Sequence, residues 1–258
     1  MRKLGHEVDL YAPIDNEFRG DFNQIDIPIC DPNPQLELDL YHKYSKELKA
    51  SDVVYDMSHT KIFSDILYNE GYKTFINLQL GFSWNVPQCK KNVCVPSKNS
   101  ANAALIGLNG FENTLWYESV GHTGKLESCR YVHFGTNIDF YLPKYEKQDY
   151  FLWFGGFMPW KGTHIAIALA KEMGFKLILA SGIVEQESQK QYREYCLNEI
   201  KESSNIKYIE LPNNKEHQLI KRSLIQNAKA FLSPVIYAEG FGLVNIETLS
   251  CATPVITT

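Results

Sequence analysis

The chain has 258 residues, enough for one large or two ordinary domains with a substantial buried core. Its net charge of -4, with no basic stripe, excludes nucleic acid as the main partner, because such binding depends on many cationic contacts to phosphate. The six cysteines are scattered without the spacing of metal ligands or of a disulfide framework. The sequence shows no signal-peptide pattern and no transmembrane segment, so we expect a cytoplasmic protein, free or peripheral at the inner membrane face.

Strand-like and helix-like patterns alternate along the chain. The expected strands are Glu7–Ala12, Val53–Met57, Thr74–Leu78, Val93–Val95, Tyr131–Phe134, Phe151–Phe154, Lys176–Ala180, Ile206–Ile209, Ala230–Ser233 and Val255–Ile256. The expected helices are Leu36–Lys49, Lys61–Tyr68, Asn99–Leu105, Thr163–Met173, Glu187–Lys201, Glu216–Asn227 and a short one that ends near Cys251. This alternation predicts an α/β fold with parallel sheets and crossover helices.

A polar, charged stretch, Pro143–Asp149, predicts a boundary between two domains, residues 1–145 and 146–258. In open parallel sheets, ligands bind beyond the carboxyl ends of the strands. With two such domains, the cleft between them is the expected site.

A glycine turn between two glutamates follows the apolar strand Ala230–Ser233. Gly240 and Gly242 allow a close backbone approach to a ligand, and the amides of the next helical turn favour an anion. Glu247, one turn into that helix, is expected to reach the same pocket as Glu239. Backbone amides can donate hydrogen bonds to a phosphate, and the carboxylates beside them can accept hydrogen bonds from hydroxyls. This combination suits a sugar nucleotide. In the structural alternative, Glu247 has no ligand and only complements the helix dipole, an interaction that stabilises a helix by about 0.3–1 kcal/mol.

Three motifs carry a resemblance to a known family. They are Glu239-Gly-Phe-Gly-Leu-Val-Asn-Ile-Glu247 with the following Thr248–Ile256, the stretch Tyr150–Gly162, and His133-Phe-Gly-Thr-Asn-Ile-Asp139. From about residue 131 onward the chain resembles the glycogen-synthase-like retaining glycosyltransferases, glycosyltransferase family 4. The resemblance implies a GT-B fold, which is two Rossmann-like, doubly wound parallel-sheet domains that face a cleft.

The same resemblance implies a retaining, hexosyltransferase-like enzyme that moves a sugar from a nucleotide-sugar donor to an acceptor. The acceptor is expected to be a carbohydrate, a lipid-linked sugar or a small molecule. The nucleotide sugar is a substrate, so no cofactor is expected, and no metal. Residues 1–145 are expected to form the acceptor side and residues 146–258 the donor-binding side.

By resemblance, Lys161 and Glu239 are the catalytic candidates, Lys161 on the leaving diphosphate and Glu239 at the donor sugar. Glu247 is expected to hold the ribose hydroxyls. The whole donor-binding set implied is Gly155, Gly156, Lys161, Glu239, Gly240, Phe241, Gly242, Leu243, Val244 and Glu247.

This chain departs from the family pattern at several positions. Gly156 stands where the family usually has an Arg that pairs with the Lys on the diphosphate. Asn77 stands where the acceptor-side domain usually has a His, and His59 is a second acceptor-side candidate, with a structural role as its alternative. Ala252 replaces a helix-terminating Gly, which predicts a slightly different helix ending.

Both ends of the sequence resemble cut edges, so both domains are expected to be incomplete and the chain to be a fragment of a longer one. A whole protein with a reduced fold is the alternative. A catalytically weakened nucleotide-sugar-binding module is the competing function, because of Gly156, Asn77 and the expected missing ends.

Overall fold

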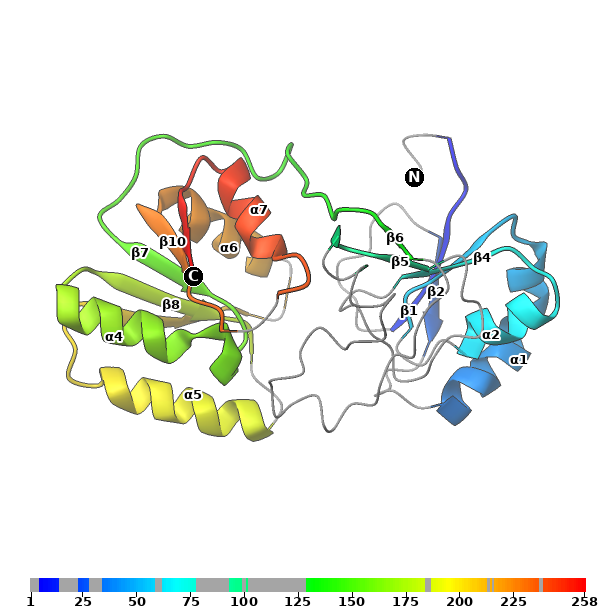
Figure 1. The fold of residues 1–258 in the computed structure, drawn as a ribbon, viewed down its shortest axis with the longest axis horizontal. Coiled ribbons are helices and arrows are strands. Elements are labelled where there is room, and N and C mark those ends of the chain that lie inside the picture. The colour runs from blue at the N-terminus through cyan, green and yellow to red at the C-terminus, as the bar shows by residue number, and fades with distance from the viewer. Residues whose placement is uncertain are drawn as a thin grey trace. The chain divides into compact units, whose positions relative to one another are not determined.

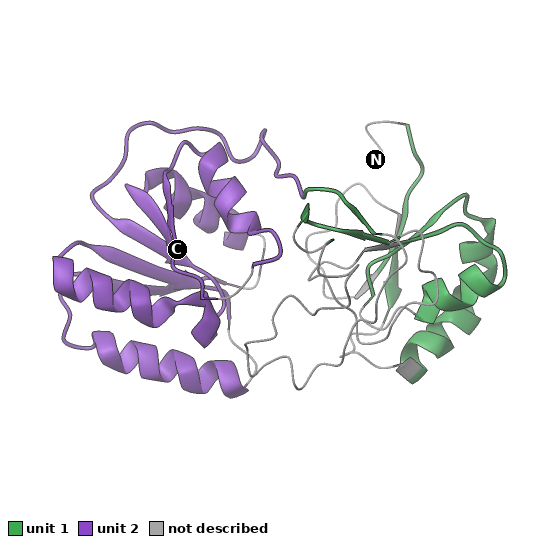
Figure 2. Ribbon diagram, viewed as in Figure 1, with its two compact units in different colours: residues 1–133 green, residues 134–258 purple. Residues whose placement is uncertain are grey.

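The computed structural model describes residues 5–13, 23–27, 34–58, 62–77, 93–98, 101, 129–183, 187–212, 214, 216–236 and 239–258 (Figure 1). The chain forms two compact units, Met1–His133 and Phe134–Thr258 (Figure 2). Both are built from parallel strands and helices, as the alternating sequence pattern predicts.

The first unit contains two described sheets. Its elements are β1 (Asp9–Pro13), β2 (Asn23–Ile27), α1 (Pro34–Ala50), β3 (Val54–Asp56), α2 (Ile62–Asn69), β4 (Thr74–Asn77), β5 (Val93–Val95) and β6 (Arg130–Tyr131). Strands β1 and β2 form a parallel pair, and β3-β4-β5-β6 form a parallel four-stranded sheet. Strand β2 was not expected, because its polar sequence lacks an apolar run and its pairing with β1 supplies the backbone partners instead.

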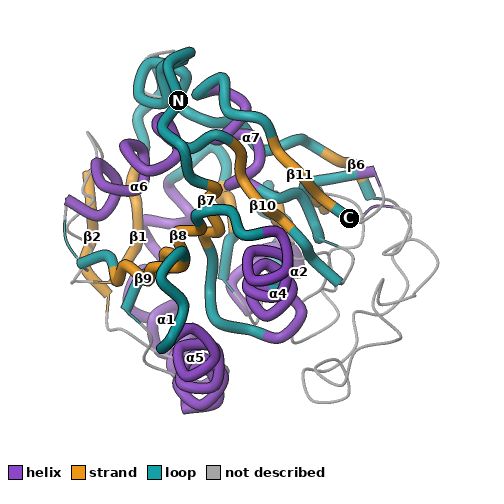
Figure 3. The backbone as a smooth tube through the Cα atoms, turned by 90° about the vertical axis from the view of Figure 1, so that its left-hand side faces the viewer, coloured by secondary structure: helices purple, strands orange, loops and turns teal. Residues whose placement is uncertain are grey.

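The second unit is a doubly wound domain. Its elements are β7 (Phe151–Phe154), the short 3₁₀ helix η3 (Pro159–Lys161), α4 (Thr163–Met173), β8 (Leu177–Ser181), α5 (Glu187–Ile200), β9 (Ile206–Glu210), α6 (Glu216–Asn227), β10 (Ala230–Ser233), α7 (Leu243–Ser250) and β11 (Val255–Thr257). The strand order is β11-β10-β7-β8-β9, with every neighbouring pair parallel (Figure 3). Numbered within this unit, the order is 3-2-1-4-5, as in the first five strands of the dinucleotide-binding fold.

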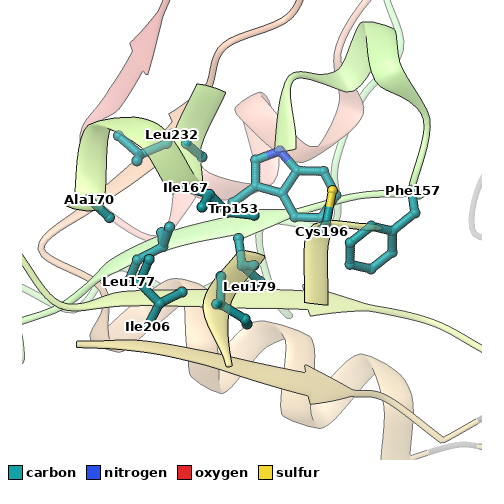
Figure 4. Packing of buried hydrophobic residues seen from close by; sticks show 11 residues of the cluster. Trp153, Phe157, Ile167, Ala170, Leu177, Leu179, Cys196, Ile206 and Leu232 are labelled. Atoms are coloured by element: carbon teal, nitrogen blue, oxygen red, sulfur yellow. The ribbon is translucent and has the colours of Figure 1, made fainter. Parts of the chain in front are cut away.

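Helices cover both faces of that sheet, α4 and α5 on one side and α6 and α7 on the other (Figure 1). The strands are therefore nearly continuous apolar runs, as β10 shows with all four of its residues buried. Figure 4 shows the core on the α4 and α5 side, where Trp153 and Phe157 pack with their ring centroids 5.5 Å apart. Leu152 and Phe231 belong to a separate core cluster that also includes Ile225 of α6.

Several sequence predictions in this unit are confirmed to the residue: β7, β10, α4 and α6 have the expected bounds. Their patterns are long or strongly apolar, and glycines or charged turns limit them on both sides. Among the described helices, none combines the length and the apolar composition needed to cross a bilayer.

The segment Phe134–Tyr150 packs on the second unit. Lys147 donates hydrogen bonds to the carbonyl oxygens of Gln226 (3.0 Å) and Cys251 (3.1 Å) and to Thr253 Oγ1 (2.6 Å). This one ammonium joins the ends of α6 and α7. The boundary expected at residue 145 thus falls inside the second unit, because the polar side chains of this stretch bond to helix ends rather than to water alone.

Helix α7 ends in a left-handed residue that is not glycine. Ala252 has φ of 55°. Its N–H bonds to the carbonyl of Leu249 (3.0 Å), and the N–H of Thr253 bonds to that of Thr248 (3.2 Å). These two bonds define a Schellman motif. The helix therefore ends as a glycine-terminated helix does, which differs from the ending expected from Ala at this position.

The strained alanine gives a stability prediction. Ala252→Gly should stabilise the protein by about 1 kcal/mol, because a Cβ in the left-handed region costs roughly 1–2 kcal/mol and glycine loses slightly more entropy on folding. Gly174→Ala is the matched reverse change: Gly174 ends α4 at φ of 72° with nothing within 4 Å of the added Cβ, so it should cost about 1 kcal/mol. Urea unfolding followed by tryptophan fluorescence measures both. Equal stabilities for Ala252→Gly and the wild-type chain would contradict this account.

Candidate functional site

The second unit reverses its winding direction between β7 and β10. From β7 the chain runs through β8 to β9 at one edge of the sheet, and α6 then returns it to β10 and on to β11 at the other edge. The loops that follow β7 and β10 consequently start side by side at the carboxyl ends of neighbouring strands, where open parallel sheets generally bind their ligands.

The loop after β7 is shaped by η3 and a left-handed glycine. Gly162 has φ of 71° and connects η3 to α4. The indole N–H of Trp153 donates to the Lys161 carbonyl at 3.2 Å, which ties the end of the loop to a side chain of the sheet. Lys161 is therefore held by its backbone, while its side chain extends from the start of α4.

The loop after β10 is fastened to the first loop. The N–H of Ile236 donates to the Trp160 carbonyl at 2.9 Å. A Cβ on Gly162 would lie 1.8 Å from the Pro234 carbonyl oxygen, so the two backbones approach more closely than any other residue type permits. Both contacts set the separation of the two loops.

Across this junction, Lys161 Nζ lies 2.6 Å from Glu239 Oε2. The two side chains are 29% and 27% exposed, so solvent still reaches them. The two residues that the sequence singles out as catalytic candidates, 78 positions apart, are thus neighbours at this switch point.

Helix α7 begins directly after this pair. Gly242 at its N-cap has φ of 78°, and its carbonyl accepts the N–H of Asn245 at 2.9 Å. The edge of the Phe241 ring meets Phe134, with centroids 5.5 Å apart. The first-turn amides, which include those of Leu243 and Val244, have no partner within a helix, and together with the dipole they favour an anion.

Glu247, in the second turn of α7, has two partners that sequence analysis missed. Lys221 Nζ of α6 lies 2.7 Å from its Oε2, and the Tyr141 hydroxyl donates to its Oε1 at 3.0 Å. Burial raises the pKa of Tyr141 above its ordinary value, and the charge of Glu247 adds to the rise. Tyr141 lies next to the stretch expected to be a domain boundary, and Lys221 lies on the expected helix Glu216–Asn227, so the sequence carried no signal for either.

Gly156 has an ordinary backbone conformation, since it is not among the glycines with positive φ. An added Cβ would meet Met158 Cε at 3.6 Å and Gln189 Oε1 at 3.9 Å, which are normal contacts. The loop therefore has room for a side chain where the family usually carries Arg. The neighbouring Gly155 would place a Cβ 3.4 Å from the Trp153 ring.

The acceptor-side candidates are less defined. His59 and the side chain of Asn77 lie outside the described residues; the backbone of Asn77 ends β4. The buried carboxylate of Asp56, at the end of β3, accepts the N–H of Ser58 at 2.7 Å and the hydroxyl of Ser64 at 2.6 Å. Asp56 thus holds the turn after β3 against α2. Within the part of the chain that the structure describes, no cluster of His, Cys, Asp and Glu has the arrangement of a metal site.

Comparisons with a family model and with solved structures find proteins that are similar to this chain. Residues 136–258 match the model of the family "Glycosyl transferases group 1". A search of curated proteins gave no match. Among solved structures, a glycosyltransferase from Rickettsia africae ESF-5 aligns at 16% identity over 99% of this chain and 72% of that one, with a TM-score of 0.68.

Two further structures align over most of the chain. AviGT4, a glycosyltransferase involved in avilamycin A biosynthesis, is 20% identical over 100% of this chain and 67% of its own, with a TM-score of 0.65. HepE of Anabaena, solved with UDP-glucose, is 16% identical over 90% of this chain and 67% of its own, with a TM-score of 0.63.

The close approach at Gly162 gives a prediction for the site. Gly162→Ala should destabilise the protein by about 3 kcal/mol or more, because the added Cβ meets a backbone oxygen at a left-handed residue and the loops must separate. Gly135→Ala is the control, since nothing lies within 4 Å there and its φ is not left-handed; it should change stability by less than about 0.5 kcal/mol. Thermal melts compare them. Similar melting temperatures for both variants would be inconsistent with the contact.

The family match and the fold point in the same direction. Residues 136–258 are similar to the group 1 glycosyl transferases, and the chain as a whole has the GT-B fold.

Proposed function

We propose that this protein transfers a sugar from a nucleotide-sugar donor to an acceptor hydroxyl with retention of configuration. The observation that carries the proposal is the Lys161–Glu239 pair at the switch point of the second unit's sheet, beside the N-terminus of α7. A cation, a helix N-terminus and a carboxylate meet there, and a donor offers a diphosphate and a sugar at matching positions.

In this proposal the diphosphate lies between the Lys161 ammonium and the first-turn amides of α7. Both favour negative charge, which grows on the diphosphate as the sugar leaves, so they lower the barrier without a metal. Glu239 then faces the hydroxyls of the donor sugar, and Glu247 the ribose. The solved complex of HepE with UDP-glucose supports a nucleotide sugar as the ligand class.

Retention and the absence of a cofactor follow from the family resemblance. The leaving diphosphate oxygen takes the proton of an acceptor that attacks on the same face, so no protein nucleophile or cofactor is required. The acceptor is a carbohydrate, a lipid-linked sugar or a small molecule, bound by the first unit.

A second function is a nucleotide-sugar-binding module with weakened catalysis. Gly156 favours it, because the loop carries one cation, Lys161, where the family usually has two. The two functions differ in turnover: the enzyme releases free sugar slowly from its donor when no acceptor is present, whereas the module binds the donor and leaves it intact.

The decisive experiment combines binding with turnover. A thermal-shift screen with UDP-, GDP- and ADP-sugars identifies the donor, since a ligand of the native state raises the melting temperature. Hydrolysis of the nucleotide sugar that raises the melting temperature is then followed in the presence of the protein. A shift with hydrolysis supports the enzyme and a shift without it the module, whereas no shift with any nucleotide sugar contradicts both.

Glu239→Gln tests the ion pair. In the absence of donor, the Glu239 carboxylate neutralises Lys161 and repels a diphosphate. The Glu239→Gln variant should therefore bind free UDP roughly two- to fivefold more tightly, because a partly exposed ion pair is worth about 0.5–1 kcal/mol. Sugar transfer should fall at least about a hundredfold. Lys161→Met, the opposite change, should weaken UDP binding and transfer together.

Calorimetry with UDP and a transfer assay measure these effects. If Glu239→Gln and Lys161→Met alter UDP affinity in the same direction, the pair is structural and the assignment of Lys161 to the diphosphate is wrong.

Gly156→Arg tests the missing cation. The loop accepts a Cβ at this position, so the variant should fold as well as the wild-type chain. A guanidinium beside Lys161 should strengthen diphosphate binding by about 1.5–3 kcal/mol, or roughly ten- to a hundredfold. Gly156→Ala is the control and should bind as the wild-type chain does. A stably folded Gly156→Arg without tighter binding would show that the missing Arg does not limit this protein.

A further inference from the structure

The pair of Lys221 and Glu247 lies deeper than the pair at the switch point. Their side chains are 10% and 14% exposed, whereas those of Lys161 and Glu239 are 29% and 27% exposed. A buried charge needs a partner of opposite sign, and Lys221 Nζ, 2.7 Å from Oε2, is that partner. The ammonium therefore compensates the charge of the Glu247 carboxylate.

The other oxygen of Glu247 is held by Tyr141. The tyrosine hydroxyl lies 3.0 Å from Glu247 Oε1 and 3.2 Å from Gln218 Oε1. A hydroxyl has one proton to donate, and the bond to the charged and nearer oxygen is the stronger one. Because burial raises the pKa of Tyr141, its hydroxyl keeps this proton at neutral pH.

Lys221 is itself fixed in place. Its ammonium lies 5.0 Å from the centroid of the Phe154 ring, a cation–π contact, and Phe154 is the last residue of β7. The carboxylate of Glu247 is thus set by three elements: α6 supplies Lys221, β7 supplies the ring beneath it, and the segment that opens the second unit supplies Tyr141.

The arrangement leaves a defined capacity for a ligand. An ionised carboxylate has about four acceptor positions, two on each oxygen. Tyr141 uses one position on Oε1 and Lys221 one on Oε2. Oε2 is enclosed by the protein, so the position left for a ligand is the second one on Oε1. One hydroxyl that donates a single hydrogen bond matches this capacity, and the 2′-hydroxyl of a ribose is such a donor.

We propose that Tyr141 and Lys221 are positioning residues that orient the Glu247 carboxylate toward the 2′-hydroxyl of the nucleotide's ribose. The inference rests on the proposed function, in which Glu247 faces the ribose. It adds that ribose recognition in this protein depends on a tyrosine from the segment Phe134–Tyr150 and on a lysine from α6, both outside the glycine-turn motif.

The test compares ribose with 2′-deoxyribose ligands. Calorimetry gives dissociation constants for UDP, ADP and GDP and for their 2′-deoxy forms, with the 258-residue chain as it is. The variants are Tyr141→Phe, which removes only the hydroxyl, Lys221→Met, which removes the charge and keeps the stem, and Glu247→Ala.

Two matched controls come from the same region. Tyr150→Phe removes a buried hydroxyl that donates to the Leu224 carbonyl of α6 at 2.8 Å, and Lys147→Met removes an ammonium that bonds to the ends of α6 and α7. The partners of Tyr150 and Lys147 do not include Glu247. Both variants should therefore leave the preference for ribose unchanged, even if they lower the melting temperature.

The wild-type chain should bind its preferred ribonucleotide about tenfold or more tightly than the 2′-deoxy form. Tyr141→Phe, Lys221→Met and Glu247→Ala should each remove most of that ratio, mainly by weakening the ribonucleotide. If Lys221→Met does not fold, Tyr141→Phe decides alone. An unchanged ratio in Tyr141→Phe, or an equal loss of the ratio in the two controls, overturns the inference.

The experiment distinguishes a failure of this inference from a failure of the proposed function. A wild-type chain that binds a nucleoside diphosphate equally well with and without the 2′-hydroxyl overturns the inference and leaves the proposed function standing. A wild-type chain that binds none of the six nucleotides overturns both.

Discussion

The contact between Gly162 and the Pro234 carbonyl determines how the site is built. It brings together the loops that follow β7 and β10, and the hydrogen bond from Ile236 to Trp160 holds them there. Only a residue without Cβ, in a left-handed conformation, permits this approach. The reversal of winding places the two loops side by side, but their separation, and so the meeting of a lysine with a glutamate, depends on this one close contact.

Two of the Lys–Glu pairs in the second unit include a glutamate of the glycine-turn motif, and they lie at different depths. The pair Lys161–Glu239 is partly exposed, so separating it costs little, because a pair in contact with water is worth little. The pair Lys221–Glu247 is more deeply buried, and breaking it would leave an uncompensated charge. In the proposed function, a chain with a net charge of -4 thereby offers a local cation to the diphosphate without a positive field over the whole surface.

The segment Phe134–Tyr150 combines two tasks. It leads from the first unit into the second, and its polar side chains attach it to α6 and α7 through backbone carbonyls at the helix ends. Helix ends leave carbonyls that need donors, and Lys147 meets that need while it anchors the segment. The same attachment brings the Tyr141 hydroxyl to Glu247, so a stretch with the composition of a linker supplies part of the site.

The sequence by itself determined the α/β fold, the bounds of β7, α4, α6 and β10, and the two glutamates and the lysine as site candidates. These follow from local patterns: apolar runs, helical periodicity and glycine turns next to charged residues. Only the tertiary structure decided which charges pair, that Tyr141 and Lys221 hold Glu247, and that Ala252 keeps a left-handed helix ending. The physical reason is that sequence patterns are local, whereas these contacts join positions far apart in the chain. Periodicity reports which side of an element is apolar, whereas a hydrogen bond between positions 106 residues apart depends on how the sheet order brings their elements together.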